Sequence, residues 1–385
     1  MKIAITTLAV SVTSLLALGL VMLYSSSMMM VDRRTHSEVG AHMLQMQLVW
    51  CVLGFIAAMV VASRDTDLIK KYAWVIFVGC LVLSGMVFLP RPIGIELNGA
   101  RRWIRLPGAS FQPSEFVKIG LIIMVAWYAD FSQRKMATFK RGTLVPLLLI
   151  GAALGPVFIE PDRGTTILMG GVTVSMLVIA GARVRYLLVV VLLAGAALLY
   201  SFKHDSMRSG RISAWLHPEA HMSGAARQAE EAKIAIGSGG LTGLGLGDGR
   251  QKHGYVPEIQ SDFIFANIGE ELGLAATLSV ITAFLLVALS GWYIAAQARD
   301  LFSCLLAVGI TALISFQAII NIGVVTSLLP NKGLALPFIS AGGSSLLAMM
   351  IGVGLLICIA RQAAPVPIAG SDITPDANPF AAKAA

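Results

Sequence analysis

Ten long apolar runs, separated by segments that hold nearly all the charge, limit how this chain can fold. The runs cover residues 3–23, 44–62, 72–90, 114–130, 143–159, 165–182, 186–202, 270–296, 302–327 and 344–361. A helix needs about 20 apolar residues to cross the hydrocarbon core of a bilayer. Only 13% of the residues are charged, whereas a soluble domain carries about 25%. Because irregular backbone cannot face lipid, each run is expected to be a helix, and strands are not expected.

The fold class that follows is an all-α, polytopic membrane protein with about ten transmembrane helices. Residues 1–362 are expected to form one transmembrane domain, with a large extracytoplasmic loop, about 203–261, between the seventh and eighth helices. Residues 363–385 are rich in proline, alanine and polar residues and show no periodicity. They are predicted to be a disordered cytoplasmic tail.

Basic residues divide unequally between the two sides of the predicted bundle. An even number of crossings puts both termini on one side, and the short connections on that side contain ten basic residues. The short connections on the other side contain four. Since short cytoplasmic loops are enriched in lysine and arginine, both termini are predicted to be cytoplasmic. Two longer outer segments, 91–113 and 203–261, are also basic, which suits either anionic headgroups or an anionic substrate.

One acid stands at the edge of an apolar run. Asp262 is followed by three large apolar residues, so it is expected where water meets hydrocarbon. A carboxylate at that boundary is costly and is usually retained for chemistry. The preceding segment, 236–247, contains six glycines, which indicates tight turns or close backbone approach. It includes G-x-G-x-G, but no strand of a soluble βαβ unit is expected before it, so the pattern does not indicate a dinucleotide-binding fold.

A second candidate segment opens the fourth apolar run. Pro113 and Ser114 are typical of a helix start, with Ser114 as the N-cap. Glu115 and Lys118 are three residues apart, so they can form an ion pair on one helix face. That pair is either an ordinary helix-end contact or part of a site.

A third segment, 160–166, is a short turn between two runs. Asp162 precedes a helix, where a carboxylate meets the positive end of the helix dipole. Helix capping alone would explain this acid. Arg101 and Arg102, further back in the chain, suit either interfacial anchoring beside Trp103 or anion binding.

A fourth segment, 329–345, places two prolines and three glycines among apolar residues at membrane depth. Such a sequence predicts a broken or re-entrant segment, which is tolerated only where it lines a protein cavity. Lys332 provides a cation there. The alternative is a plain loop with Ser344 as the cap of the next helix.

These segments together resemble the SEDS family, of the FtsW/RodA/SpoVE type, and the resemblance runs through nearly all of residues 3–361. The matching stretches are 98–104, 111–118, 161–165, 238–247, 256–273 and 329–345. As a set they are highly specific. The chain departs from the commoner family residues at Ser261, Asn331 and Ala341, among others. The stretch from Lys332 to Leu334 is more similar to the division branch, FtsW, than to the elongation branch, RodA.

The resemblance implies a peptidoglycan glycosyltransferase that polymerises lipid II, an undecaprenyl-pyrophosphate-linked disaccharide peptide, outside the cytoplasmic (inner) membrane during cell division. It implies as partners a class B penicillin-binding protein transpeptidase and other membrane proteins of the division machinery at the septum, and no nucleic acid. A RodA-type enzyme of cell elongation remains an alternative. So do a lipid II flippase and a non-catalytic scaffold. A flippase needs charges through the membrane depth, but here they gather at the outer ends of the runs.

The resemblance also implies that Asp262 is the catalytic acid and that Glu115, Lys118 and Asp162 line or brace a central cavity. Sugar transfer needs a base for the acceptor hydroxyl, the role expected of Asp262. It also needs cations that hold the pyrophosphate as charge develops. The expected cations are Arg101, Arg102, Lys118, Arg211 and Lys332, and Glu258 and Ser344 complete the candidate site. Whether a divalent ion, Mg²⁺ or Mn²⁺, held partly by phosphate, takes part in place of these cations is left open by the sequence.

Overall fold

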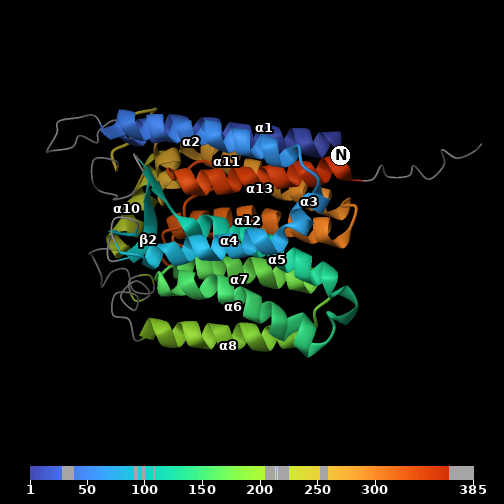
Figure 1. The fold of residues 1–385 in the computed structure, drawn as a ribbon. Coiled ribbons are helices and arrows are strands. Elements are labelled where there is room, and N and C mark those ends of the chain that lie inside the picture. The colour runs from blue at the N-terminus through green and yellow to red at the C-terminus, as the bar shows by residue number, and fades with distance from the viewer. Residues whose placement is uncertain are drawn as a thin grey trace, which may run out of the picture.

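The computed structural model describes residues 1–27, 39–90, 94–97, 100–106, 109–203, 213, 215, 225–251 and 259–363. Its helices run roughly parallel in one bundle (Figure 1). The long helices are α1 (Lys2–Ser27), α2 (Val39–Ala62), α4 (Ala73–Gly85), α5 (Pro113–Phe131), α6 (Val145–Ile159), α7 (Arg163–Ile179), α8 (Val184–Lys203), α10 (Ala225–Ser238), α11 (Ile264–Ala296), α12 (Leu301–Val325) and α13 (Gly343–Gln362). The shorter ones are α3 (Thr66–Lys71), η1 (Met86–Phe88), η2 (Gln133–Lys135) and the π-helix η3 (Lys140–Leu144).

Each of the ten apolar runs contains one of these helices, which confirms the all-α membrane fold. Six helices in the described part of the chain are long and apolar enough to cross a membrane by themselves. Large apolar side chains are exposed on the outer surface of the bundle, including Phe55 and Met59 of α2 and Leu285 and Leu289 of α11. A surface like this suits lipid and not water. Ten crossings remain a prediction.

The expectation of no strands is wrong for one connection. Residues of the loop between α4 and α5 form a three-stranded antiparallel sheet of β1 (Gly94–Leu97), β2 (Ala100–Leu106) and β3 (Ala109–Phe111), in the order β1-β2-β3. The rule against strands holds within hydrocarbon, where an open sheet edge cannot be solvated. This sheet lies at one end of the bundle (Figure 1), called the sheet end below, where water can satisfy its edges.

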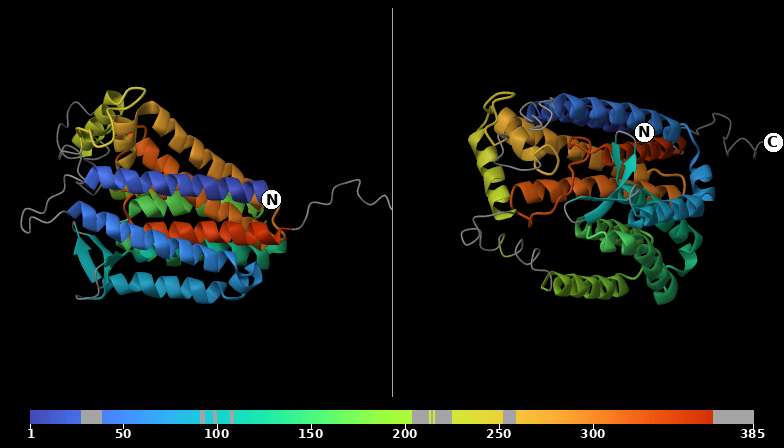
Figure 2. Two further views of the ribbon diagram at one scale, coloured as in Figure 1. Left: turned by 90° about the horizontal axis from the view of Figure 1, so that it is seen from above. Right: turned by 60° about the vertical axis from the view of Figure 1, so that its left-hand side comes forward.

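The start of α1 and the end of α13 both lie at the opposite end of the bundle from the sheet (Figure 1). Helix α10 lies at the sheet end beside α11 (Figure 2). Small residues let α2 and α13 approach closely: a Cβ at Gly354 would lie 2.6 Å from the carbonyl oxygen of Ala58. Such small-residue contacts are typical of helix pairs in membranes, where packing replaces the hydrophobic effect.

The glycine-dense segment follows α10 and lies against the first part of α11. Helix α11 is broken at Gly273, which has φ +75°. Around this break, Leu244 N donates to Glu270 O at 3.0 Å and Leu274 N donates to Gly240 O at 3.0 Å. A Cβ at Gly243 would overlap the carbonyl oxygen of Glu271, so glycine is required there. The prediction of close backbone approach is therefore confirmed.

Candidate active site at the sheet end

Asp262 lies in a turn immediately before α11 and is partly exposed. Three successive carbonyl groups of this turn accept hydrogen bonds from the region of α12 and the segment that follows it. Gln260 O accepts from Ala341 N at 3.0 Å, Ser261 O accepts from Ser340 Oγ at 2.5 Å, and Asp262 O accepts from Asn321 Nδ2 at 2.9 Å. The backbone of the acid is thus fixed, and the residue remains partly exposed.

The Asp262 carboxylate lies against the backbone of Gly333. A Cβ built at Gly333 would lie 2.6 Å from Asp262 Oδ2, so any larger residue would displace the carboxylate. Lys332 is partly buried beside this contact, and its neighbour Asn331 donates to Gln228 of α10 at 3.1 Å, outside the helices of the bundle. Burial lowers the pKa of the Lys332 ammonium. The structure therefore places the predicted acid and this predicted cation in one region.

The segment between α12 and α13 is irregular, and its part from Leu334 to Ser340 is buried except for the partly buried Ala335. This fits the prediction of a broken segment. Leu336, Phe338 and Ile339 are at most 3% exposed. A Cβ at Gly19 of α1 would lie 2.7 Å from Ile339 Cα. Gly19 is eight residues before the end of α1, so the segment reaches roughly 12 Å into the bundle at 1.5 Å per residue. Protein surrounds this backbone, which is the condition for irregular structure at membrane depth.

Ser344 does not cap α13. The N-cap position is Gly342, and within the described part of the chain no side chain caps the helix there. Ser344 is 3% exposed and its Oγ accepts from Gln112 N at 3.3 Å, which joins the start of α13 to the start of α5. The capping hypothesis is wrong because Ser344 lies inside the helix and faces α5.

The predicted ion pair on α5 is confirmed and is deeply buried. Lys118 Nζ lies 2.7 Å from Glu115 Oε2 and donates to Gln317 Oε1 at 3.1 Å. Lys118 is 1% exposed and Glu115 is 7% exposed. The N-cap prediction is wrong by two residues, since Gln112 occupies that position and Ser114 is a buried helical residue that accepts from Gln112 Nε2. The lysine is enclosed within the protein.

Asp162 caps α7, as the capping hypothesis predicted. Its Oδ1 accepts from Thr165 N at 3.1 Å and its Oδ2 accepts from Thr165 Oγ1 at 2.9 Å. Arg102 of β2 fixes the same turn, because its guanidinium donates to the carbonyl oxygens of Glu160 and Pro161, each at 2.9 Å. Charged donors at the last carbonyls of a helix stabilise its C-terminus. These contacts give Asp162 and Arg102 structural roles.

Glu160, in this turn, has a perturbed carboxyl group. Burial raises its pKa from 4.5 to about 7, the nearby Asp162 carboxylate adds to the rise, and Ser84 and Arg102 oppose it. Between pH 4.5 and 7 the folded state therefore binds more protons than the unfolded state, so stability falls as pH rises through that window. We expect Glu160→Gln to raise the melting temperature at pH 8 by a few degrees and to leave it little changed at pH 5. Thermal unfolding in detergent across this range measures the effect, and an unchanged pH slope would contradict it.

The irregular segment connects most of the candidates. Leu334 contacts Gly164, beside Asp162, and Gln317 joins Lys118 to the carbonyl oxygen of Ala335. Arg101 does not join this group: it is exposed on the sheet and pairs with Glu96 at 3.2 Å. Arg211 and Glu258 lie outside the described residues.

Sequence reasoning missed Gln317 and Asn321, two buried amides of α12. Both are 1% exposed. They are four residues apart in an apolar run, so they share one helix face. Two amides at this spacing in an apolar run could have been recognised from the sequence. Polar groups in a membrane helix must find hydrogen-bond partners, so they predict contacts with other elements.

Glu270 and Glu271, which follow the Asp262 turn, hold the glycine loop. Glu270 Oε1 accepts from the backbone N–H of Arg250 at 2.7 Å and of Gln251 at 3.2 Å. Glu271 Oε2 accepts from Ser25 Oγ at 2.5 Å and from Gly247 N at 3.1 Å. Among the residues described, no group of three or more histidine, cysteine, aspartate or glutamate side chains comes together as a metal site.

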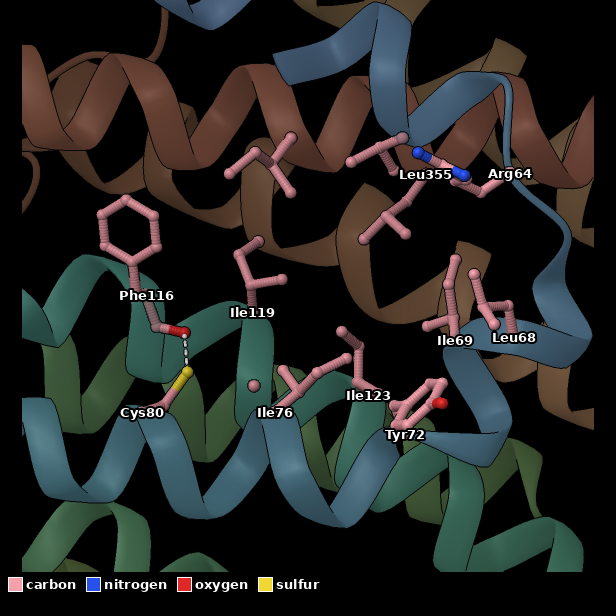
Figure 3. A pocket seen from close by; sticks show the side chains of 13 residues that line it. Arg64, Leu68, Ile69, Tyr72, Ile76, Cys80, Phe116, Ile119, Ile123 and Leu355 are labelled. Carbon is pink, nitrogen blue, oxygen red and sulfur yellow. Dashed lines mark hydrogen bonds between the residues drawn. The ribbon is translucent and has the colours of Figure 1, made fainter.

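An apolar cavity of about 300 Å³ lies between α2, α3, α4, α5 and α13 (Figure 3). It extends along α5 from Phe116, next to Glu115, to Ile123, and Arg64 and Tyr72 line its other end. Cys80 Sγ donates to Phe116 O at 3.4 Å within this wall. None of the candidate site residues that the structure describes lines the cavity, but Phe116 at one end directly follows Glu115 of the ion pair in the chain.

Comparison with known proteins identifies a family that shares this sequence and architecture. The profile of a family described as "Cell cycle protein", FtsW/RodA/SpoVE, matches residues 6–364. The probable peptidoglycan glycosyltransferase FtsW of Geobacter metallireducens is 41% identical over 355 residues, which cover 92% of this chain and 94% of the relative. The stage V sporulation protein E of Bacillus subtilis is 35% identical over 347 residues, 90% of this chain and 94% of the relative.

Two solved structures share the fold. A chain of a peptidoglycan synthase complex, described as coordinating polymerization and crosslinking, is 25% identical with a TM-score of 0.76, over 92% of this chain and 96% of that one. The rod shape determining protein RodA of Thermus thermophilus is 25% identical with a TM-score of 0.67, over 93% and 97%. The chain belongs to the FtsW/RodA/SpoVE family of polytopic membrane proteins.

Proposed function

We propose that this chain is a peptidoglycan glycosyltransferase that polymerises lipid II on the outer face of the cytoplasmic membrane, with Asp262 as its catalytic base. The observation that carries the proposal is the Asp262 turn. Its backbone is bonded to three groups of the α12–α13 region, while Asp262 as a residue is partly exposed at the sheet end. The names of the relatives, FtsW among them, support the reaction class.

In the proposed reaction, the Asp262 carboxylate accepts the proton of the acceptor sugar's 4-hydroxyl as that oxygen attacks the donor sugar. The bond from the donor sugar to the lipid pyrophosphate breaks, and the pyrophosphate leaves with the bonding electrons. A positioned base contributes roughly 10²–10⁴-fold to such a step. Fixing the base on a bonded turn also lowers the entropic cost of reaching the reactive geometry.

The departing pyrophosphate needs positive charge close to Asp262. Lys332 is the cation next to the Gly333 contact and is partly exposed, so we propose that it meets the pyrophosphate. Lys118 is 1% exposed and already pairs with Glu115, so it is a poorer candidate without rearrangement of the site. Arg102 is also a poorer candidate, because its guanidinium already donates to two carbonyl oxygens.

The lipid tail of the substrate would lie between helices. We propose that it occupies the apolar cavity along α5, since the lining is almost wholly hydrocarbon and Phe116, at one end, directly follows Glu115 in the chain. A shorter prenyl chain would fill less of it and bury less apolar surface. A lipid II with a shortened tail should therefore show a higher KM, and equal KM values would remove the cavity from the proposal.

The proposal also covers the orientation of the chain in the membrane and its place in the cell. We place the sheet end outside the cell and both termini in the cytoplasm, as one domain of residues 1–362. The short connections at the other end carry Arg64, Lys70, Arg183 and Arg299 among their basic residues, as cytoplasmic loops do. The FtsW relatives favour a role at the division septum, and the solved synthase complex favours a class B penicillin-binding protein as partner.

The experiment is to reconstitute the full chain in liposomes and supply lipid II on one side only, with and without the cognate transpeptidase. Glycan strands should form when lipid II is on the side of the sheet end. Movement of lipid II between leaflets without strand formation would replace the proposal with a flippase.

A further inference from the structure

Asn321 of α12 joins two separate parts of the candidate site through one side-chain amide. Its Nδ2 donates to Asp262 O at 2.9 Å and to Leu334 O at 2.7 Å. Asp262 and Asn321 are 59 residues apart in the chain. The first bond holds the turn that carries the acid, and the second holds the segment that carries Lys332 and Gly333. The relative position of these two parts therefore depends on this amide.

The amide is held on a regular helix, four residues before the end of α12. Asn321 is 1% exposed on α12, whose neighbouring buried residues include Ala318 and Val324. The other two donors to the Asp262 turn, Ala341 N and Ser340 Oγ, belong to the irregular segment. Asn321 alone among these three donors is on a regular helix, so it links both irregular parts to the same helix.

The two carbonyl oxygens that Asn321 holds require a side chain at position 321 with two N–H donors on one nitrogen. A carboxylate of the same shape has no donor, and a hydroxyl has one. A buried carbonyl that loses its partner incurs a desolvation penalty, so the turn would shift to recover a bond. Any shift of Asp262 O moves the carboxylate of the same residue, which already touches Gly333.

We infer that Asn321 is a positioning residue of the transfer reaction. It fixes the position of Asp262 relative to the Lys332–Gly333 backbone and does not touch the substrate. This inference rests on the proposed function of Asp262. Because the buried amide lies behind the turn, its loss should act on the chemical step and leave substrate binding nearly unchanged. Misplacement of a catalytic group by about 1 Å can cost roughly 10²-fold in rate.

The test compares the steady-state kinetics of Asn321→Ala and Asn321→Ser with those of the unchanged chain, using lipid II in detergent. We expect kcat to fall about 10- to 100-fold for Asn321→Ala, with KM within about twofold. Asn321→Ser keeps one donor and should lie between the two. The matched control is Thr311→Ala, a buried polar residue of the same helix whose hydroxyl has no hydrogen-bond partner among the described residues. Its kcat should be unchanged.

A double variant separates this inference from the function on which it rests. In an Asp262→Asn background the Asn321→Ala change should have little further effect on kcat, because there is no base left to position. Unchanged kcat in Asn321→Ala, a change confined to KM, or fully additive losses would overturn the inference. If Asn321→Ala does not fold, Asn321→Ser decides alone, and full activity there would overturn it too. An active Asp262→Asn would instead overturn the proposed function.

Discussion

Asp262→Asn should reduce lipid II polymerisation by at least about 100-fold, because an amide of the same shape cannot accept the hydroxyl proton. The substitution keeps the size of the side chain and leaves in place the backbone carbonyl that accepts from Asn321 Nδ2. The variant should therefore fold normally and bind lipid II with nearly unchanged affinity. Strand formation from purified, monodisperse protein measures the effect.

Asp248→Asn is the matched control for this change. Asp248 is an exposed acid of the neighbouring glycine loop, so its neutralisation alters the charge near the site by the same amount. It should retain activity within about twofold. If both variants lost activity equally, local charge would explain the result and Asp262 would not be the base.

The helix framework could be predicted because each helix in a bilayer must be apolar over its own length. That signal is local, so all ten runs contain a helix of the structure. The sheet of residues 94–111 was missed because the rule behind the prediction applies only within hydrocarbon. The error at Ser114 has a local origin: Pro113 takes the first helical position, which makes Gln112 the N-cap and leaves Ser114 inside the helix.

The candidate site was only partly predictable for the same physical reason. Asp262, Asp162 and the Glu115–Lys118 pair could be found because charge at the edge of an apolar run is visible locally. Their arrangement depends on the irregular segment between α12 and α13, and on two amides whose partners lie on other elements. Hydropathy does not distinguish a buried amide with such partners from one that faces a pore.

Lys118→Met should be the most destabilising of the changes considered, by about 3–5 kcal/mol, because it leaves the Glu115 carboxylate buried without its cation. The two groups are 2.7 Å apart and almost fully enclosed. The free energy of unfolding in mixed detergent micelles measures the effect. The control is Lys233→Met on α10, where Lys233 and Glu230 have the same three-residue spacing at 2.6 Å but are both exposed. That change should cost less than about 1 kcal/mol.

The double variant Glu115→Gln/Lys118→Met then separates structure from chemistry. Removing both charges of a buried pair is often neutral for stability, so the double variant should unfold near the value of the unchanged chain. If Lys118 only braces the bundle, polymerisation should return with stability. A stable double variant with no activity would show instead that the lysine acts on the substrate, and would place the pyrophosphate deeper in the bundle than Lys332. A double variant as unstable as Lys118→Met would contradict the assignment of the loss to an unpaired Glu115.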